Sequence, residues 1–122
     1  MIEGGTPTIY VSNMDRAVEF YTEVLGLRLI SRYGDEWASV DVGKGLTLGL
    51  HPATERMRAP GTLGSINIGL NVTQSIDDVV RTLESRGVTF DGPIQGDTNG
   101  SIRLAFFGDP DGNSLYLCES KY

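Results

Sequence analysis

Val11-Ser12-Asn13-Met14-Asp15-Arg16-Ala17-Val18-Glu19-Phe20-Tyr21 is the stretch that decides the fold. It joins the end of a β-prone run to a helix whose apolar residues recur at amphipathic spacing. A glycine, Gly26, then stops the helix. Val11 and Gly26 recur 61 residues further on as Val72 and Gly87, with the same order of elements around them. A unit of this length that is present only twice indicates an internally paired domain, since a solenoid needs three or more repeats.

The paired pattern organises the whole chain, whose 122 residues suffice for one compact domain. We expect one domain over residues 1–122, with modules at 6–51 and 65–119 and a linker at 52–64. Each module is predicted to run strand, helix, strand, strand, strand, which is an α+β arrangement. The predicted strands are residues 7–11, 28–33, 37–42, 46–51, 65–72, 88–94, 101–107 and 114–118, and the predicted helices begin after Ser12 and at Ser75.

Composition excludes several classes of protein. Ten basic and sixteen acidic residues give a net charge of −6, which disfavours phosphate backbones and anionic lipid. We therefore expect no nucleic-acid partner and no membrane partner. The N-terminal residues lack a basic region followed by an apolar run, and a cytoplasmic location is the expectation. The single cysteine, Cys118, cannot form an internal disulfide.

Strand alternation sorts the side chains onto two faces of the predicted sheets. One face is apolar throughout and is expected to carry the helices. The other face is polar, aromatic and small, unlike a charged solvent surface, and it is typical of the lining of a ligand site. An ordinary polar sheet face is the alternative. The candidate ligand-binding residues are Tyr10, Trp37, Asp41, Gly49, His51, Asn67, Asn71, Arg103 and Tyr116.

Each candidate has a functional and a structural interpretation. Arg103 suits an anionic ligand group, or else it pairs with Asp41 or is simply exposed. Trp37 suits stacking on an aromatic ligand, or packing in a dimer. His51 suits a general base, or is solvated at the end of its strand. Residues 109–112, Asp-Pro-Asp-Gly, are better explained as a turn than as catalytic acids.

The opening stretch, with Val24-Leu25-Gly26-Leu27 after it, resembles the first module of the vicinal oxygen chelate superfamily. So does the tail Phe107-Gly108-Asp109-Pro110-Asp111-Gly112-Asn113. This superfamily includes glyoxalase I, extradiol dioxygenases and bleomycin-resistance proteins. The resemblance implies two βαβββ modules that form an open curved sheet around a cleft, and it implies a homodimer. Fold does not settle the reaction.

The resemblance also implies four metal-ligand positions, at Thr6 (or Thr8), Gly49, Asn67 and Tyr116. Metal-dependent members carry His, Gln or Glu there, because divalent transition metals prefer imidazole and carboxylate groups. This chain has none of these residues at the four positions, so we expect no metal cofactor. A shifted, partial site would combine His51 with Asp41.

The leading hypothesis is therefore a metal-free small-molecule binding protein, similar to the bleomycin-resistance type that sequesters a drug. The alternative is a lyase, isomerase or dioxygenase of the same superfamily that uses a partial or shifted metal site. In that case His51, Asp41 and Tyr116 are the candidate proton carriers. A third hypothesis is a structural module that has kept the fold and lost the cleft.

Overall fold

The computed structural model describes residues 1, 3–54, 59–62 and 66–121 and divides the chain into two compact units, Met1–Pro60 and Gly61–Tyr122. The boundary falls inside the predicted linker. Residues 55–58, 63 and 64 of that linker, and residue 65 at the start of the predicted fifth strand, lie outside the described residues. Within the described part of the chain, no helix is long and apolar enough to cross a membrane.

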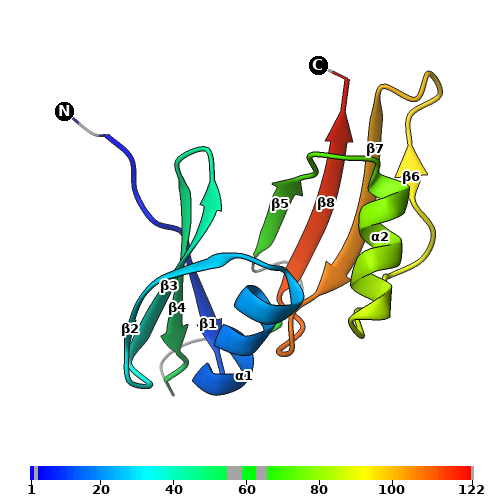
Figure 1. The fold of residues 1–122 in the computed structure, drawn as a ribbon. Helices are drawn as coiled ribbons and strands as arrows, with labels where there is room; N and C mark the ends of the chain where they lie inside the picture. The colour runs from blue at the N-terminus through cyan, green and yellow to red at the C-terminus, as the bar shows by residue number, and fades with distance from the viewer. Residues whose placement is uncertain (2, 55–58, 63–65, 122) are drawn as a thin grey trace. The chain divides into compact units, whose positions relative to one another are not determined.

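The first unit contains β1 (Thr8–Val11), α1 (Met14–Glu19), a turn of π-helix (Phe20–Val24), β2 (Arg28–Tyr33), β3 (Trp37–Gly43) and β4 (Leu46–Pro52). Its four strands form one sheet in the order β1-β4-β3-β2 (Figure 1). β1 runs parallel to β4, and the other neighbours are antiparallel. This is the βαβββ order that the sequence predicts.

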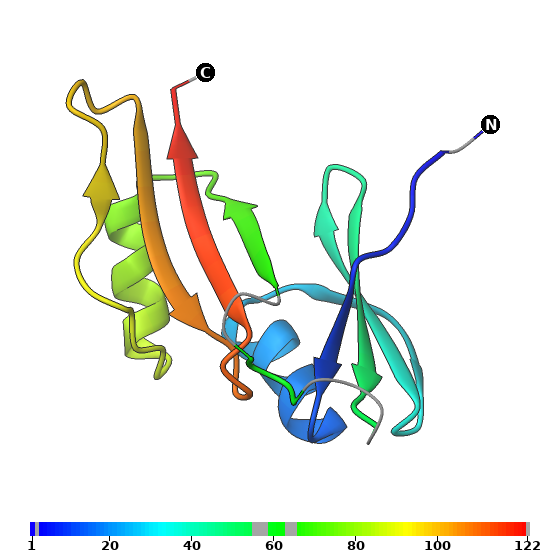
Figure 2. The ribbon, with the colours of Figure 1, turned by 180° about the vertical axis from the view of Figure 1, so that it is seen from behind.

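The second unit repeats the arrangement with β5 (Asn67–Asn71), α2 (Ile76–Ser85), β6 (Gln95–Gly96), β7 (Ile102–Gly108) and β8 (Ser114–Ser120). Its sheet has the order β5-β8-β7-β6, with β5 parallel to β8. Figures 1 and 2 view the strands of this sheet from its two sides, with α2 along one of them. The α+β class and the two βαβββ modules are therefore confirmed.

Local sequence explains where α1 begins and where both helices end. The side chain of Asn13 accepts a hydrogen bond from the backbone N–H of Arg16 at 3.0 Å and caps α1. Gly26 and Gly87 adopt φ of 76° and 96°, the left-handed region that ends helices and that glycine enters at no steric cost. The pair of stop signals that the repeat predicts is thus present in both modules.

Each unit buries one face of its sheet under its own helix. In the first unit α1 packs against β3 and β4, and in the second α2 packs against β7 and β8. Most of the fully buried side chains are aliphatic and come from the predicted apolar face and from the helices; they include Ile9, Val11, Tyr21, Val40, Leu48, Leu50, Ile76 and Leu115, and Phe107 of β7 is buried with them. Burial of this apolar surface is the main force that holds each helix on its sheet.

The predicted strand at residues 88–94 is wrong. Only Gln95 and Gly96 form β6, and Phe90 contributes a single bridge to Phe107. Gly92 adopts φ of 85°, and the following Pro93 lacks a backbone N–H, so the chain cannot continue a regular ladder here.

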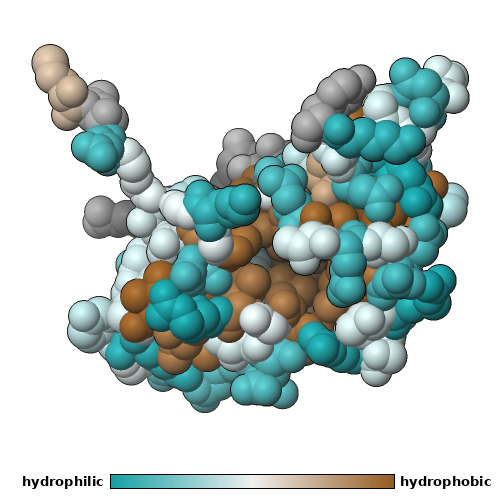
Figure 3. Space-filling view, turned by 45° about the horizontal axis from the view of Figure 1, so that its top comes forward, coloured by the Kyte–Doolittle hydropathy of each residue, from teal (hydrophilic) through white to brown (hydrophobic). Residues whose placement is uncertain are grey.

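The edge strand of the first sheet, β2, presents apolar side chains. Leu29, Ile30 and Tyr33 are 40%, 46% and 68% exposed. Brown atoms at the left of Figure 3 reach the surface on the side where Figure 1 shows β2. The pairing of β2 with β3 is irregular between Leu29 and Ser31, and such a bulge interrupts the regularity of an edge.

Candidate functional site

The face of each sheet opposite its own helix carries most of the candidate residues. The first helix-free face, on β1, β3 and β4, consists of Thr8, Tyr10, Trp37, Ser39, Asp41, Thr47, Gly49 and His51. The second helix-free face, on β5, β7 and β8, consists of Asn67, Gly69, Asn71, Leu104, Phe106, Ser114, Tyr116 and Cys118. Eight of the nine predicted site residues lie on these two faces, and Arg103 does not.

Trp37 and Gly49 form the centre of the first helix-free face. Gly49 is buried and lies beside Thr8 on one side and Ser39 on the other. A Cβ atom added to Gly49 would lie 2.2 Å from Cη2 of Trp37, which is far below an ordinary carbon contact. The six-membered ring of Trp37 therefore occupies the space that any side chain at position 49 would take.

His51 and Tyr10 are paired on the same face. They lie in register on parallel strands, and their rings meet edge to face with centroids 5.7 Å apart. Nδ1 of His51 lies 2.7 Å from the carbonyl oxygen of Pro52. Because that oxygen can only accept, Nδ1 must carry the proton and donate it. Tyr10 is 38% exposed, a large exposed fraction for an aromatic residue within a strand.

Asp41 is bound by neighbouring groups of its own sheet. Its carboxylate accepts hydrogen bonds from the backbone N–H of Gly43 at 2.8 Å and from the guanidinium of Arg28 at 2.9 Å. The Gly43 N–H first, and then Arg28, hold the pKa of Asp41 below its usual value. Asp41 therefore stays ionised near neutral pH and is a poor proton carrier.

The predicted partial site of His51 with Asp41 is wrong. Asp41 lies in register with Thr47, whereas His51 lies beyond the Ala38–Leu50 pair. The two side chains are thus separated by four residues along the sheet, about 13 Å at the usual strand rise. The pairing register of β3 and β4, which the sequence alone does not specify, decides this separation.

The second helix-free face repeats the contact of an aromatic ring with a glycine. Gly69 lies in register with Tyr116, and a Cβ added to Gly69 would lie 2.4 Å from Cζ of the Tyr116 ring. Phe106 pairs with Tyr116 from the other side, with ring centroids 5.5 Å apart. Tyr116 is therefore held between the backbone of Gly69 and the ring of Phe106.

The two asparagines lie at opposite ends of β5. Asn71 lies beside Cys118, and Asn67 lies beside Ser114. Asn67 borders a hollow of about 200 Å³, which is lined by Ile66, Asn67, Asp91, Phe106, Phe107, Ser114 and Leu115. This volume admits a small substituent but is below that of a typical drug-sized pocket.

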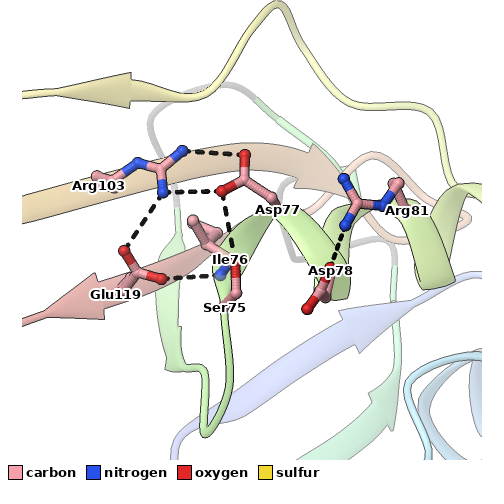
Figure 4. Close-up of polar contacts among 7 residues, drawn as sticks. All are labelled: Ser75, Ile76, Asp77, Asp78, Arg81, Arg103 and Glu119. Atoms are coloured by element: carbon pink, nitrogen blue, oxygen red, sulfur yellow. Dashed lines mark hydrogen bonds and ion pairs between the residues drawn. The ribbon is translucent and has the colours of Figure 1, made fainter.

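The prediction that Arg103 shares a face with Tyr116 is wrong. Ala105 and Phe107, which lie two and four positions after Arg103 and so share its face of β7, are buried on the side of α2. Arg103 also points to that side, where it makes two hydrogen bonds of 2.9 and 3.0 Å to Asp77 and one of 3.5 Å to Glu119 (Figure 4). The hydrogen bonds from the Arg103 guanidinium hold the pKa of Asp77 below its usual value.

Glu119 and Arg103 together hold the start of α2. The second carboxylate oxygen of Glu119 accepts the backbone N–H of Ile76 at 2.9 Å, whereas the Ser75 side chain makes no capping bond (Figure 4). A carboxylate at this end of a helix is favourable because the first N–H groups have no partner within the helix. The cluster is structural, and Arg103 is not available to clamp a ligand anion.

Sequence reasoning missed Phe106 as a member of the second face. A signal for Phe106 is present in the chain, because the turn at residues 109–112 sets the register of β7 and β8. Gly108 pairs with Ser114, and counting back from this pair gives Phe107 with Leu115 and Phe106 with Tyr116. Because both faces of β7 carry apolar residues, alternation alone does not show which of them lies toward the helix.

The predicted turn is supported by buried side chains. Asp109 and Asn113 are 6% and 4% exposed. The Asp109 carboxylate accepts from the Asn113 backbone N–H at 2.8 Å and from its Nδ2 at 2.9 Å, while Oδ1 of Asn113 accepts the N–H of Gly61 at 3.0 Å. The interpretation of residues 109–112 as a turn is confirmed.

The residues at the four implied ligand positions do not fit a divalent transition metal. Gly49 has no donor and no room for one, because the Trp37 ring fills that space. Tyr116 lies in register with Gly69, and not with Asn67. Across the described ranges, no three His, Cys, Asp or Glu side chains gather closely enough to hold a metal ion. The expectation of a metal-free protein stays a prediction, since it rests on donor chemistry.

Two βαβββ units, each with an aromatic-lined face opposite its helix, define a class of paired-module α+β proteins. The family model of the glyoxalase/bleomycin resistance protein/dioxygenase superfamily matches residues 5–117. The chain belongs to this superfamily.

The relatives include lactoylglutathione lyases and an antibiotic binding protein. A probable lactoylglutathione lyase from Vibrio cholerae is 26% identical over 91% of this chain and 86% of its own. The crystal structure of TnmS3, an antibiotic binding protein from a Streptomyces species, has a TM-score of 0.79 and 29% identity over 99% of this chain and 98% of its own. A superfamily member from Sphaerobacter thermophilus has a TM-score of 0.80 and 30% identity, with 98% of both chains covered.

Proposed function

We propose that this protein binds a small planar organic molecule through the aromatic side chains of its helix-free sheet faces, without a metal ion. The observation that carries the proposal is that an aromatic ring lies at each of two positions where the family resemblance implies a metal ligand. At one, Gly49, the Trp37 ring occupies the space of a side chain; at the other, the Tyr116 ring lies over Gly69. Aromatic surface takes the place of metal donors in both sheets.

The chemistry of these faces supports the binding of an aromatic compound. Trp37 and Tyr116 are each half-buried, so part of each ring remains accessible. Offset stacking or edge contact with a ligand ring contributes about 0.5–1.5 kcal/mol beyond the burial of area. A polar neighbour on each face, Thr8 on the first and Asn71 on the second, supplies a hydrogen-bonding group that can orient a ligand.

The similarity to an antibiotic binding protein supports the same proposal. That relative matches almost the full length of this chain at 29% identity. We infer that the ligand is a drug or metabolite with an aromatic ring system, and that the protein sequesters it. We also propose a homodimer, which the family resemblance implies. Sedimentation as a monomer at micromolar concentration would contradict the dimer.

Thermal unfolding with a panel of antibiotics and aromatic metabolites tests the binding proposal. A ligand at a hundredfold excess over its dissociation constant stabilises the native state by about 2.7 kcal/mol. The Trp37→Leu variant should lose the stabilisation, and Phe20→Leu, an aromatic residue on the π-helical turn, should retain it. Failure of every compound to raise the melting temperature would refute the proposal.

A lyase is the second candidate, because the curated relatives include lactoylglutathione lyases from Vibrio cholerae and Haemophilus influenzae. Their identity of 26% extends over 91% of this chain. The donor set argues against a metal-dependent reaction of this kind. Elemental analysis of protein purified without chelator separates the two candidates, since stoichiometric zinc, nickel, manganese or iron would overturn the metal-free proposal.

A further inference from the structure

The histidine on the first helix-free face is held in one tautomer. Nδ1 of His51 donates to the carbonyl oxygen of Pro52 at 2.7 Å, as its distance and the chemistry of that oxygen require. In a neutral imidazole only one nitrogen carries a proton. Nε2, on the opposite side of the ring, is therefore the nitrogen with a lone pair, and it can accept a hydrogen bond.

No donor among the described residues satisfies this lone pair. The contacts of His51 in the described part of the chain are the Pro52 carbonyl and the edge-to-face contact with Tyr10. The residue is half-buried, and among the described residues no side-chain nitrogen or oxygen is both buried and unpaired, so Nε2 is open to solvent and to a bound molecule. A bound molecule with an N–H or O–H group can take the place of water at this acceptor and donate to it.

The surroundings of His51 specify the rest of that molecule. Ala38 pairs with Leu50, so the next residues along the two strands, Trp37 and His51, are neighbours on the helix-free face. Tyr10 flanks His51 from β1. His51 therefore has aromatic residues as neighbours on both flanking strands, and a ring that contacts Trp37 can bring a ring substituent to His51.

We infer that the ligand class of this site is a planar aromatic compound with a hydroxyl or ring N–H donor at its edge, which His51 accepts through Nε2. The inference rests on the proposed binding function and deepens it. It assigns His51 a role in ligand specificity, with no proton transferred and no covalent step. The recognised feature is the donor, so a methyl ether of the same ring should be rejected.

The tautomer can be measured directly, because His51 is the only histidine of the chain. Long-range ¹H–¹⁵N NMR of uniformly labelled protein, recorded where the imidazole is neutral, should show a protonated Nδ1 and an unprotonated Nε2. No assignment is needed, since a single imidazole contributes to the spectrum. A spectrum with the proton on Nε2 would overturn the inference without bearing on the wider binding proposal.

Binding is tested with matched probes that differ only in the donor. Phenol and anisole, 2-naphthol and 2-methoxynaphthalene, and 1-hydroxypyrene and 1-methoxypyrene span a range of ring sizes. Calorimetric titration should give about tenfold tighter binding of the hydroxyl compound in the pair that fits, as one additional hydrogen bond supplies. Chemical-shift changes at the histidine Nε2 should accompany that binding and be absent with the ether.

Two variants distinguish the effect of the hydrogen-bond acceptor of His51 on ligand preference from the effect of its ring shape. His51→Phe keeps a ring next to Tyr10 and should abolish the preference for the hydroxyl compound. His51→Gln retains an amide oxygen near the position of Nε2 and should restore part of it. Equal binding of hydroxyl and ether by the unaltered protein would overturn the inference and leave the binding proposal standing. Binding of neither member of any pair would contradict both.

Discussion

The contact between Trp37 and Gly49 gives the sharpest test of the first helix-free face. The substitution Gly49→Ala adds one carbon, at a position 2.2, 2.9 and 3.0 Å from Cη2, Cζ2 and Cζ3 of the Trp37 ring. Carbon atoms in ordinary contact are about 3.5 Å apart or more. The end of the ring must therefore move by about 1.3 Å, away from the strand.

The expected cost to folding is small, because opposing effects nearly cancel. Moving the Trp37 side chain off its preferred rotamer costs about 0.5–1.5 kcal/mol. Alanine in place of glycine within a strand gains about 0.5–1 kcal/mol, since glycine loses more conformational freedom on folding. Gly49 is not among the residues with positive φ, so its backbone accepts a side chain without strain. The free energy of unfolding should change by about 1 kcal/mol or less.

The fluorescence of the protein reports the movement, because Trp37 is the only tryptophan. Gly49→Ala should shift its emission to longer wavelength while the protein stays folded. Affinity for an aromatic ligand should fall several-fold, up to about tenfold, if about 0.5–1.5 kcal/mol of ring contact is lost. Thr47→Val, a change of similar volume on the same face, is the control and should leave the emission unchanged.

Two results would refute this reasoning. Unchanged emission in a folded Gly49→Ala protein would mean that the ring does not occupy the space above Gly49. A loss of more than about 3 kcal/mol in urea unfolding would mean that the ring cannot move, and that the glycine serves packing and not an adaptable ligand surface.

The cluster at the start of α2 yields two further predictions. Glu119→Ala should lower the free energy of unfolding by about 1 kcal/mol, because the Ile76 N–H loses its cap, and Glu119→Gln should lose less than half of that in the same urea titrations. Asp77 has a pKa below its usual value because Arg103 bonds its ionised form, so its contribution to stability is present above the ordinary carboxyl pKa and is lost as pH falls through the lowered value. The unfolding free energies of the unaltered protein and of Asp77→Asn, measured from about pH 7 down to about pH 3, should therefore converge in acid; a constant gap would contradict the pairing with Arg103.

The sequence predicted the elements wherever one local signal was strong. The capped, amphipathic run after Val11 and its glycine stop fixed the first helix, and the repeat of that pattern fixed the second. The strand predicted at residues 88–94 failed because apolar content outweighed the breaking effect of Gly92 and Pro93. A helix or strand can be predicted from such local signals because its geometry depends on neighbours in the chain.

The candidate site was harder to predict, because it depends on which strands pair and in which register. Alternation placed Trp37 and His51 on the correct face, but it could not place the Trp37 ring over Gly49 of the next strand. It also assigned Arg103 to the wrong face, since Leu104 and Phe106 are as apolar as Ala105 and Phe107. A shift of one residue in the phase of a strand exchanges its two faces, and only the pairing with β8 resolves the choice.

The register also explains why Gly49 and Tyr116 should be considered together. Ile9 pairs with Leu50 in the first unit and Leu70 pairs with Leu117 in the second, so Gly49 and Tyr116 occupy equivalent places in the two modules. At this place the second module carries an aromatic ring over the glycine of β5, and the first carries a glycine under an aromatic ring of β3. A carboxylate at position 49 could not be accommodated without displacing Trp37. The equivalent position thus supports an aromatic ring in the first module and supplies one in the second.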